Sequence, residues 1–107
     1  MDKKTTLKIV KKYLNYIINE QGLDIKQAYI FGSYAKDLQN QDSDIDLAIV
    51  FNSLNDRLEM QLNLMKWRRN FDLSIEPHPF DEKEFNKNNP FAYEIINTGI
   101  NLKINWK

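Results

Sequence analysis

Several features that would define other protein classes are missing from this chain of 107 residues. It has no cysteine, which excludes disulfides and thiolate metal sites. No stretch approaches the roughly 18 consecutive apolar residues of a membrane-spanning helix, and the first 20 residues are too charged for a secretory signal. An excess of one charge is also absent, because 15 Lys and Arg balance 15 Asp and Glu. Proteins that coat nucleic acid need excess cations. We therefore expect a cytoplasmic protein with no membrane partner and no strong nucleic-acid binding.

Internal repeats, linkers and low-complexity segments are also lacking. The apolar share of 42% is ordinary for a globular protein, and the aromatic share of 12% helps a small core to bury enough surface. We expect one domain over residues 1–107, because this length fits a single hydrophobic core.

The apolar pattern predicts helices and strands in strict alternation. Leu7, Val10, Leu14 and Ile17 recur at helical spacing, as do Leu54, Leu58, Leu62 and Met65. Gly22 stands where a left-handed helix stop is expected, and Asn89-Pro90 is typical of a helix start. The predicted helices cover 5–20, a short turn after 33, 53–67 and 90–98, and the predicted strands cover 28–31, 44–51, 71–77 and 100–104. This order predicts an α/β (α+β) fold with a small mixed sheet flanked by helices.

Asp44 and Asp46 form the pattern with the clearest chemical meaning. Two residues apart on an extended strand, their carboxylates project from one face roughly 7 Å apart. Like charges at that spacing repel each other unless a cation lies between them. Mg²⁺ prefers such oxygen ligands together with substrate phosphates. The structural alternative is a pair of solvated acids where a loop enters a strand, but Asp is disfavoured in strands.

Gly32-Ser33 follows the buried segment 28–31 and suggests a phosphate-binding turn. Glycine allows a close backbone approach to a ligand, and the free N–H groups at a helix start favour phosphate. The alternative is a plain strand-to-helix turn in which Ser33 caps the helix.

Together, the stretch from Ile30 to Lys36, the polar loop 37–43 and Asp44-Ile45-Asp46-Leu47 resemble the signature of the DNA polymerase beta-like nucleotidyltransferase superfamily. The resemblance spans about residues 28–77, and the small size is similar to the minimal nucleotidyltransferases. It implies a polymerase beta palm-like fold and a third carboxylate on a neighbouring strand. Asp72 stands in that third position, within the predicted strand 71–77.

The same resemblance implies a role for each site residue. Asp44, Asp46 and Asp72 would be the catalytic and metal-binding residues for two Mg²⁺ ions, with ATP as the substrate. Gly32, Ser33, Lys36 and Ser43 would bind the nucleotide. One departure is Asp37, which stands where many relatives have glycine.

Other residues have both a functional and a structural interpretation. Glu76 lies on the same predicted face as Asp72, so it is either an extra ligand or a strand-end acid paired with an arginine. His78, the single histidine, lies between two prolines, where a structural role is the alternative to catalysis. The cations Lys66, Arg68 and Arg69 either approach a nucleotide or end a helix. The aromatic residues between 67 and 93 are expected in the core or at an interface.

We carry three functional hypotheses from the sequence. The first is an enzyme that transfers AMP to a hydroxyl of a partner protein, and the resemblance implies the antitoxin of a pair whose toxin is a HEPN-type ribonuclease. The second is a binding module that neutralises its partner by covering it, without catalysis. The third is transfer to a small molecule or to RNA ends. The zero net charge disfavours the RNA acceptor.

Overall fold

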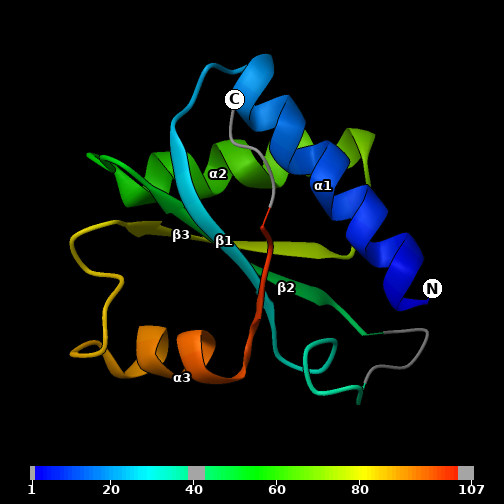
Figure 1. The fold of residues 1–107 in the computed structure, drawn as a ribbon. Coiled ribbons are helices and arrows are strands. Elements are labelled where there is room, and N and C mark those ends of the chain that lie inside the picture. The colour runs from blue at the N-terminus through cyan, green and yellow to red at the C-terminus, as the bar shows by residue number, and fades with distance from the viewer. Residues whose placement is uncertain (1, 39–42, 104–107) are drawn as a thin grey trace.

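The computed structural model describes residues 2–38 and 43–103 and confirms the predicted mixed sheet flanked by helices (Figure 1). In chain order its elements are α1 (Lys3–Asn19), β1 (Ile25–Phe31), β2 (Ile45–Phe51), α2 (Arg57–Trp67), the 3-10 helix η1 (Arg68–Asn70), β3 (Ile75–Asp81), α3 (Pro90–Thr98) and β4 (Ile100–Asn101). The helix expected after residue 33 is replaced by consecutive turns over residues 32–37. Part of the predicted loop 37–43 lies outside the described residues.

The four strands form one sheet in the order β3-β2-β1-β4. β1 pairs antiparallel with β2 and with β4, and β2 pairs parallel with β3. The strand predicted over 100–104 is the short edge strand β4, and Ile104 lies outside the described residues. β2 therefore lies inside the sheet. The last residues of β1 and the first residues of β3 lie on either side of the start of β2.

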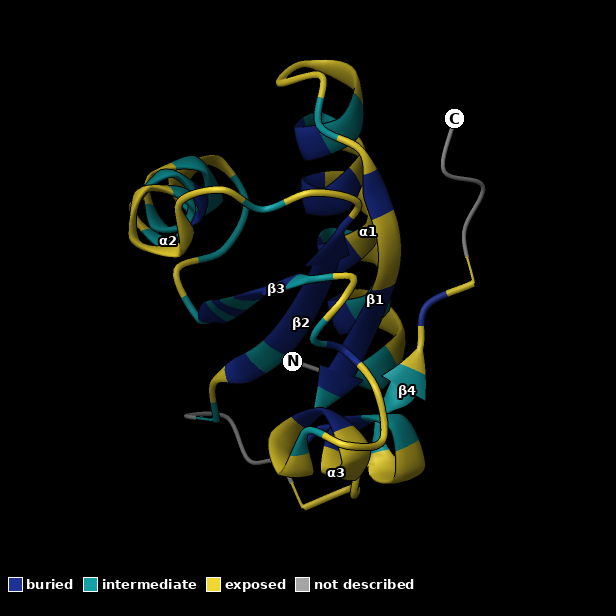
Figure 2. Ribbon diagram, turned by 90° about the vertical axis from the view of Figure 1, so that its left-hand side faces the viewer, coloured by how far each residue is buried: buried dark blue, intermediate teal, exposed yellow. Residues whose placement is uncertain are grey.

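Helices cover both faces of the sheet, and the alternation of side chains along β2 separates the two layers. Ile45, Leu47 and Ile49 pack in the larger core with residues of α1 and α2. Ala48 and Val50 point to the opposite face and pack in a second core with residues of α3. Figure 2 shows the buried strands between these helices. Asp46 shares the α3 face with Ala48 because alternate residues of a strand project to the same side.

The first helix begins earlier than the sequence predicted. Asp2 is its N-cap, and the Asp2 carboxylate accepts a hydrogen bond from the Thr5 N–H at 2.7 Å. Such a cap satisfies one of the N–H groups that have no partner within the helix. The helix ends before Gly22, whose φ of 67° confirms the expected left-handed stop.

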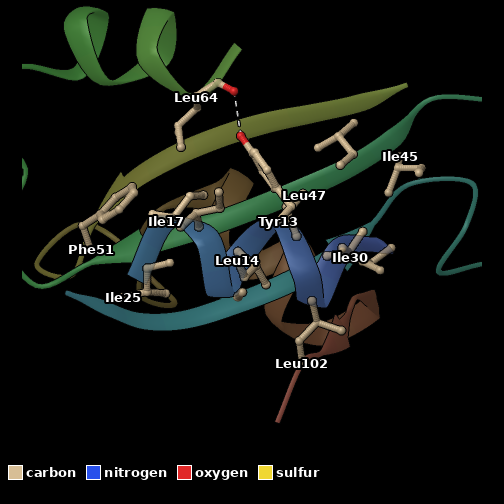
Figure 3. Packing of buried hydrophobic residues seen from close by; sticks show 14 of the residues in the cluster. Tyr13, Leu14, Ile17, Ile25, Ile30, Ile45, Leu47, Phe51, Leu64 and Leu102 are labelled. Atoms are coloured by element: carbon tan, nitrogen blue, oxygen red, sulfur yellow. Dashed lines mark hydrogen bonds between the residues drawn. The ribbon is translucent and has the colours of Figure 1, made fainter. Parts of the chain in front are cut away.

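A buried hydrogen bond joins α1 to α2. The Tyr13 hydroxyl donates to the Leu64 carbonyl oxygen at 2.7 Å, within the cluster of apolar side chains shown in Figure 3. Because the hydroxyl is buried, this bond avoids the loss of about 1–3 kcal/mol that an unpaired buried polar group would cause. The two helices are therefore fixed to each other as well as to the sheet.

The second helix turns a different side to the core from the one predicted. Leu58 and Leu62 were expected to face inward, but their exposed fractions are 70% and 63%. Leu64 is fully buried instead, and Met60 and Trp67 are partly buried against the core. The helix begins at Arg57 after an Asp56 cap, four residues later than expected.

The outer edge of the sheet at β3 is covered by side chains of α2 and η1. Pro77 and Pro79 have no N–H to leave unpaired, and prolines are tolerated on edge strands for that reason. The outward carbonyl oxygens accept side-chain hydrogen bonds, from Arg68 to Ile75 at 2.7 Å, from Gln61 to Pro77 at 2.9 Å and from Arg57 to Pro79 at 2.9 Å. These bonds join β3 to α2 and η1 and protect the edge from pairing with another strand.

The C-terminal part begins with a turn and ends in a helix against the second face. The Asp81 N–H donates to Glu84 Oε1 at 3.0 Å, and the Glu84 N–H donates to the Asp81 carbonyl oxygen at 3.0 Å, which closes a turn after β3. α3 starts as predicted at Pro90, with Asn89 as its N-cap, and ends at Gly99. Among the described residues, no helix combines the length and the apolar character needed to cross a bilayer.

Candidate active site

Gly32 and Asp46 are in close contact where β1 ends beside the start of β2. Phe31 is the register partner of Asp46, so Gly32 follows directly beside it. Gly32 has a φ of 73°, and a Cβ atom at this position would lie 2.4 Å from Asp46 Oδ2. The site therefore needs glycine here for its backbone conformation and for the space that the Asp46 carboxylate occupies. Asp44 is exposed and immediately precedes β2.

Two residues of β3 complete a cluster with Asp46. Because β2 and β3 are parallel, Glu76 is the register partner of Asp46 and His78 is the partner of Ala48. All three side chains thus project from the α3 face. One potential ligand atom from each of Asp46, Glu76 and His78 lies within 4.8 Å of the others.

The electrostatics tie Asp44 to the same cluster. A hydrogen bond with Asp44 raises the pKa of Glu76, and burial and the negative charges of Asp44 and Asp46 raise it further. A carboxyl pKa that is raised in this way indicates that several negative charges lie close together. This combination of carboxylate oxygens and an imidazole nitrogen fits a divalent cation, which would relieve the repulsion.

Asp72 lies outside this cluster and outside β3. The strand was expected over 71–77 but runs from Ile75 to Asp81. The Asp72 carboxylate accepts hydrogen bonds from the Ser74 N–H at 2.8 Å and from the Ser74 hydroxyl. Asp72 thus shapes the turn that leads into β3, and Glu76 is the acid that faces Asp46 across the sheet.

The predicted nucleotide-binding residues occupy the turns between β1 and β2. Lys36 N–H donates to the Gly32 carbonyl at 3.2 Å, and Leu38 N–H donates to the Ser33 carbonyl at 2.9 Å. These bonds close the turns over residues 32–37. Half-buried Ser33 lies within these turns, next to the glycine that contacts Asp46. The Lys36 ammonium lies 3.7 Å from Glu94 of α3, and half-buried Ser43 directly precedes Asp44.

Asp37 has the left-handed backbone that glycine adopts easily. Its φ is 58°, a backbone conformation that glycine adopts without strain. Asp is one of the residues that tolerate this conformation better than most. Its carboxylate pairs with Lys3 at 2.7 Å and is largely exposed, so this acid is directed to α1.

Aromatic rings line the side of the cluster that faces α3. The His78 ring lies edge-on to Phe31 and Phe91, with centroid distances of 5.1 and 6.1 Å. A hollow of about 160 Å³ beside it is lined by Arg57, Gln61, His78, Pro79, Phe80 and Phe91. Its volume is below the roughly 300 Å³ at which small-molecule pockets begin. Phe80 and Phe85 are buried as predicted, whereas Phe91 is about half exposed.

A second hollow, of about 380 Å³, lies away from the acids. It is lined by Lys12, Asn15, Tyr16, Asn19, Glu20 and Phe71. Tyr16 and Phe71 belong to the core on the other face of the sheet, so this hollow does not touch the acid cluster.

Comparisons with known proteins identify a matching family profile and solved structures of similar fold. A family profile described as polymerase beta, nucleotidyltransferase, matches residues 11–105. A candidate nucleotidyltransferase from Sulfolobus solfataricus aligns with a TM-score of 0.60 and 23% identity over 77% of this chain and 72% of that one. No match was found among curated proteins.

Two solved toxin–antitoxin complexes also contain a similar chain. One, with AMP-PNP, aligns with a TM-score of 0.60 and 22% identity over 92% of this chain and 73% of that one. The other is a tri-AMPylated HEPN toxin from Shewanella oneidensis with an MNT antitoxin, which aligns with a TM-score of 0.57 and 19% identity over 97% and 74%. At these identities the likeness shows a common fold.

Proposed function

The chain belongs to the polymerase beta nucleotidyltransferase family, and on this premise we propose that it transfers AMP from ATP to a hydroxyl group of a partner protein. The observation that carries the proposal is the acid cluster of β2 and β3 beside the Gly32-Ser33 turn. A phosphate-binding turn and a group of carboxylates are the two parts that metal-assisted phosphoryl transfer requires.

The proposed cofactor is Mg²⁺, held by Asp44, Asp46 and Glu76. When bound, it supplies charge neutralisation on the triphosphate and makes the acceptor hydroxyl easier to deprotonate. Ser33 and the backbone N–H groups that follow Gly32 bind the β- and γ-phosphates, and Lys36 adds a positive charge from the same turn. Gly32 keeps the space in which the Asp46 carboxylate is positioned.

The acceptor oxygen forms a new bond to the α-phosphorus, and the bond from that phosphorus to the oxygen bridging to the β-phosphate breaks. Pyrophosphate leaves with the electron pair of the broken bond. Glu76 accepts the proton of the acceptor hydroxyl on its carboxylate.

Asp72 and Glu76 compete for the role of the third acid, and the two can be separated experimentally. We propose Glu76, because it faces Asp46 across the sheet while Asp72 bonds to Ser74. Glu76→Gln should reduce transfer by about 100-fold or more, the usual contribution of a positioned acid–base group. Asp72→Asn keeps an acceptor for the Ser74 N–H and should retain most activity. The opposite ranking would assign the third acid to Asp72.

The proposed partner is a HEPN-type toxin, with this chain as its antitoxin. Support comes from the two toxin–antitoxin complexes that contain a chain of this fold. The test incubates the purified chain with its toxin, ATP and Mg²⁺ and measures the intact mass of the toxin. A gain of one or more adenylate groups, absent with Asp44→Asn/Asp46→Asn, is expected. An unchanged toxin mass would contradict the proposal.

Neutralisation in cells distinguishes catalysis from binding alone. We expect the Asp44→Asn/Asp46→Asn variant to be folded and to lose protection against the toxin. Full protection by this variant would show that the chain neutralises its partner by covering it.

A further inference from the structure

His78 belongs to the acid cluster by position, although the proposed chemistry does not require it. Its Nε2 atom lies 3.5 Å from Asp46 Oδ1. Nε2 is buried, and among residues 2–38 and 43–103 it has no hydrogen-bond partner. A buried polar atom without a partner is destabilising, so such an atom at a cluster of ligands needs an explanation.

The 3.5 Å separation is long for a hydrogen bond to a carboxylate, which is usually about 2.7–2.9 Å. It agrees with two ligands of one ion. For metal–ligand bonds of about 2.1 Å, neighbouring ligand atoms are about 3.0 Å apart in octahedral and about 3.4 Å apart in tetrahedral geometry. Glu76 supplies a third ligand atom within 4.8 Å of the other two.

The ring of His78 is held in this orientation by its neighbours. Phe31 and Phe91 contact it edge-on, and its position on β3 is fixed by pairing with Ala48 of β2. Because the ring is restrained, Nε2 needs little reordering to bind an ion. This preorganisation distinguishes His78 from an exposed histidine that approaches an acid by chance.

We propose that His78 Nε2 is a metal ligand together with Asp46 and Glu76, so that the site binds Mn²⁺, Co²⁺ or Zn²⁺ through a nitrogen ligand that Mg²⁺ does not use. Imidazole suits transition metals, whereas Mg²⁺ prefers oxygen ligands and retains its water. The inference shares the acid cluster with the proposed function, but it concerns which metals the site takes and not which group is transferred.

The single histidine makes a direct test possible by NMR of the tag-free protein. Addition of Zn²⁺ should move the imidazole Nε2 resonance much more than that of Nδ1, and Mg²⁺ should leave both nearly unchanged. Zn²⁺ that binds to the protein without moving the Nε2 resonance would overturn the proposal. This measurement uses the wild-type chain and so does not depend on the folding of a variant.

A matched variant tests the metal preference. His78→Phe keeps a ring between Phe31 and Phe91 but removes the nitrogen. Calorimetric titration without nucleotide should show Co²⁺ and Zn²⁺ binding weakened by about tenfold or more, while Mg²⁺ binding changes by less than about twofold. Equal losses for all metals, or none, would contradict a ligand role.

The same variant separates this inference from the proposed function. If His78→Phe still transfers AMP with Mg²⁺ and binds Co²⁺ as the wild type does, the inference fails and the function stands. If the wild type transfers nothing but its Nε2 resonance responds to Zn²⁺, the function fails and the metal ligand stands.

Discussion

At the scale of single residues, the site depends on a glycine for two separate reasons. Gly32 has a left-handed backbone, and it also leaves space for the Asp46 carboxylate. Gly22 has a similar φ of 67° but has no atom within 4 Å of the position that a Cβ would take. The two glycines therefore share the conformational requirement and differ in the steric one.

This difference gives a matched pair of substitutions. Both Gly22→Ala and Gly32→Ala should lower the free energy of unfolding by about 1–2 kcal/mol, the cost of a left-handed residue with a side chain. Only Gly32→Ala should also displace Asp46 and abolish Mg²⁺-dependent transfer. Denaturant unfolding and the transfer assay measure the two effects. Equal activity in both variants would show that Asp46 accommodates the added methyl group.

The raised pKa of Glu76 makes stability depend on pH in an unusual direction. A carboxyl whose pKa is raised binds its proton more tightly in the folded chain than in the unfolded one. The metal-free protein should therefore lose stability as the pH rises from about 4.5 through the raised pKa. Glu76→Gln should remove this loss and raise the melting temperature at neutral pH in EDTA.

The control for this effect is Glu82→Gln, because Glu82 is exposed and outside the acid cluster. Thermal unfolding from pH 4 to pH 8 is compared for the three proteins. If Glu82→Gln gives the same gain as Glu76→Gln, general charge and not the cluster would be responsible.

Residue types and spacing are sufficient to propose the part of the candidate site that lies between β1 and β2. The Asp44-x-Asp46 pair and the Gly32-Ser33 turn are local patterns, and the structure places Gly32 against Asp46. The facing acid depends on the register of β2 against β3, which pairs Asp46 with Glu76. No local pattern states that register, so the sequence analysis placed Asp72 in the third-acid position and left Glu76 as either an extra ligand or a strand-end acid.

At the scale of the elements, α2 shows why spacing alone misplaced a helix face. Leu58 and Leu62 are four residues apart, which is the spacing of a buried stripe. The orientation of α2 is fixed instead by Leu64, which packs in the core, and by Arg57 and Gln61, which hydrogen-bond to β3. Those hydrogen bonds form with the edge strand β3, and in the resulting orientation of α2 both Leu58 and Leu62 are exposed to solvent.

The orientation can be tested with two leucines of the same helix. Leu64→Ala should lower the free energy of unfolding by about 2–5 kcal/mol, because it leaves a cavity in the core. Leu62→Ala should change it by less than about 0.5 kcal/mol, as expected for an exposed position. Urea denaturation measures both. A large loss for Leu62→Ala would place that side chain in the core.

The β3 strand shows a second limit of pattern recognition. The alternating pattern predicted a strand over residues 71–77. β3 instead continues to Asp81, since it is the edge of the sheet and its proline nitrogens face outward. α3 was predicted correctly because Asn89, Pro90 and Gly99 mark both of its ends locally.

At the scale of the whole molecule, the sheet brings together residues from distant parts of the chain. Gly32 follows β1, Asp44 directly precedes β2, Asp46 lies on β2, and Glu76 and His78 come from β3. Asp46 and Glu76 are held by strand pairing, so the cluster persists without its ligand at the expense of charge repulsion. Binding of a cationic ligand should relieve this repulsion and therefore raise the free energy of unfolding of the whole domain.

Nucleotide and metal together should raise the melting temperature strongly. A ligand at 100 times its dissociation constant adds about 2.7 kcal/mol to the free energy of unfolding. For a domain of about 100 residues this corresponds to roughly 10 °C or more. Thermal unfolding with ATP and Mg²⁺ should show that increase in the wild type, and none with Asp44→Asn/Asp46→Asn or in EDTA. An equal increase in the double variant would mean that ATP binds away from these acids, because only binding at the acid cluster depends on the carboxylates of Asp44 and Asp46.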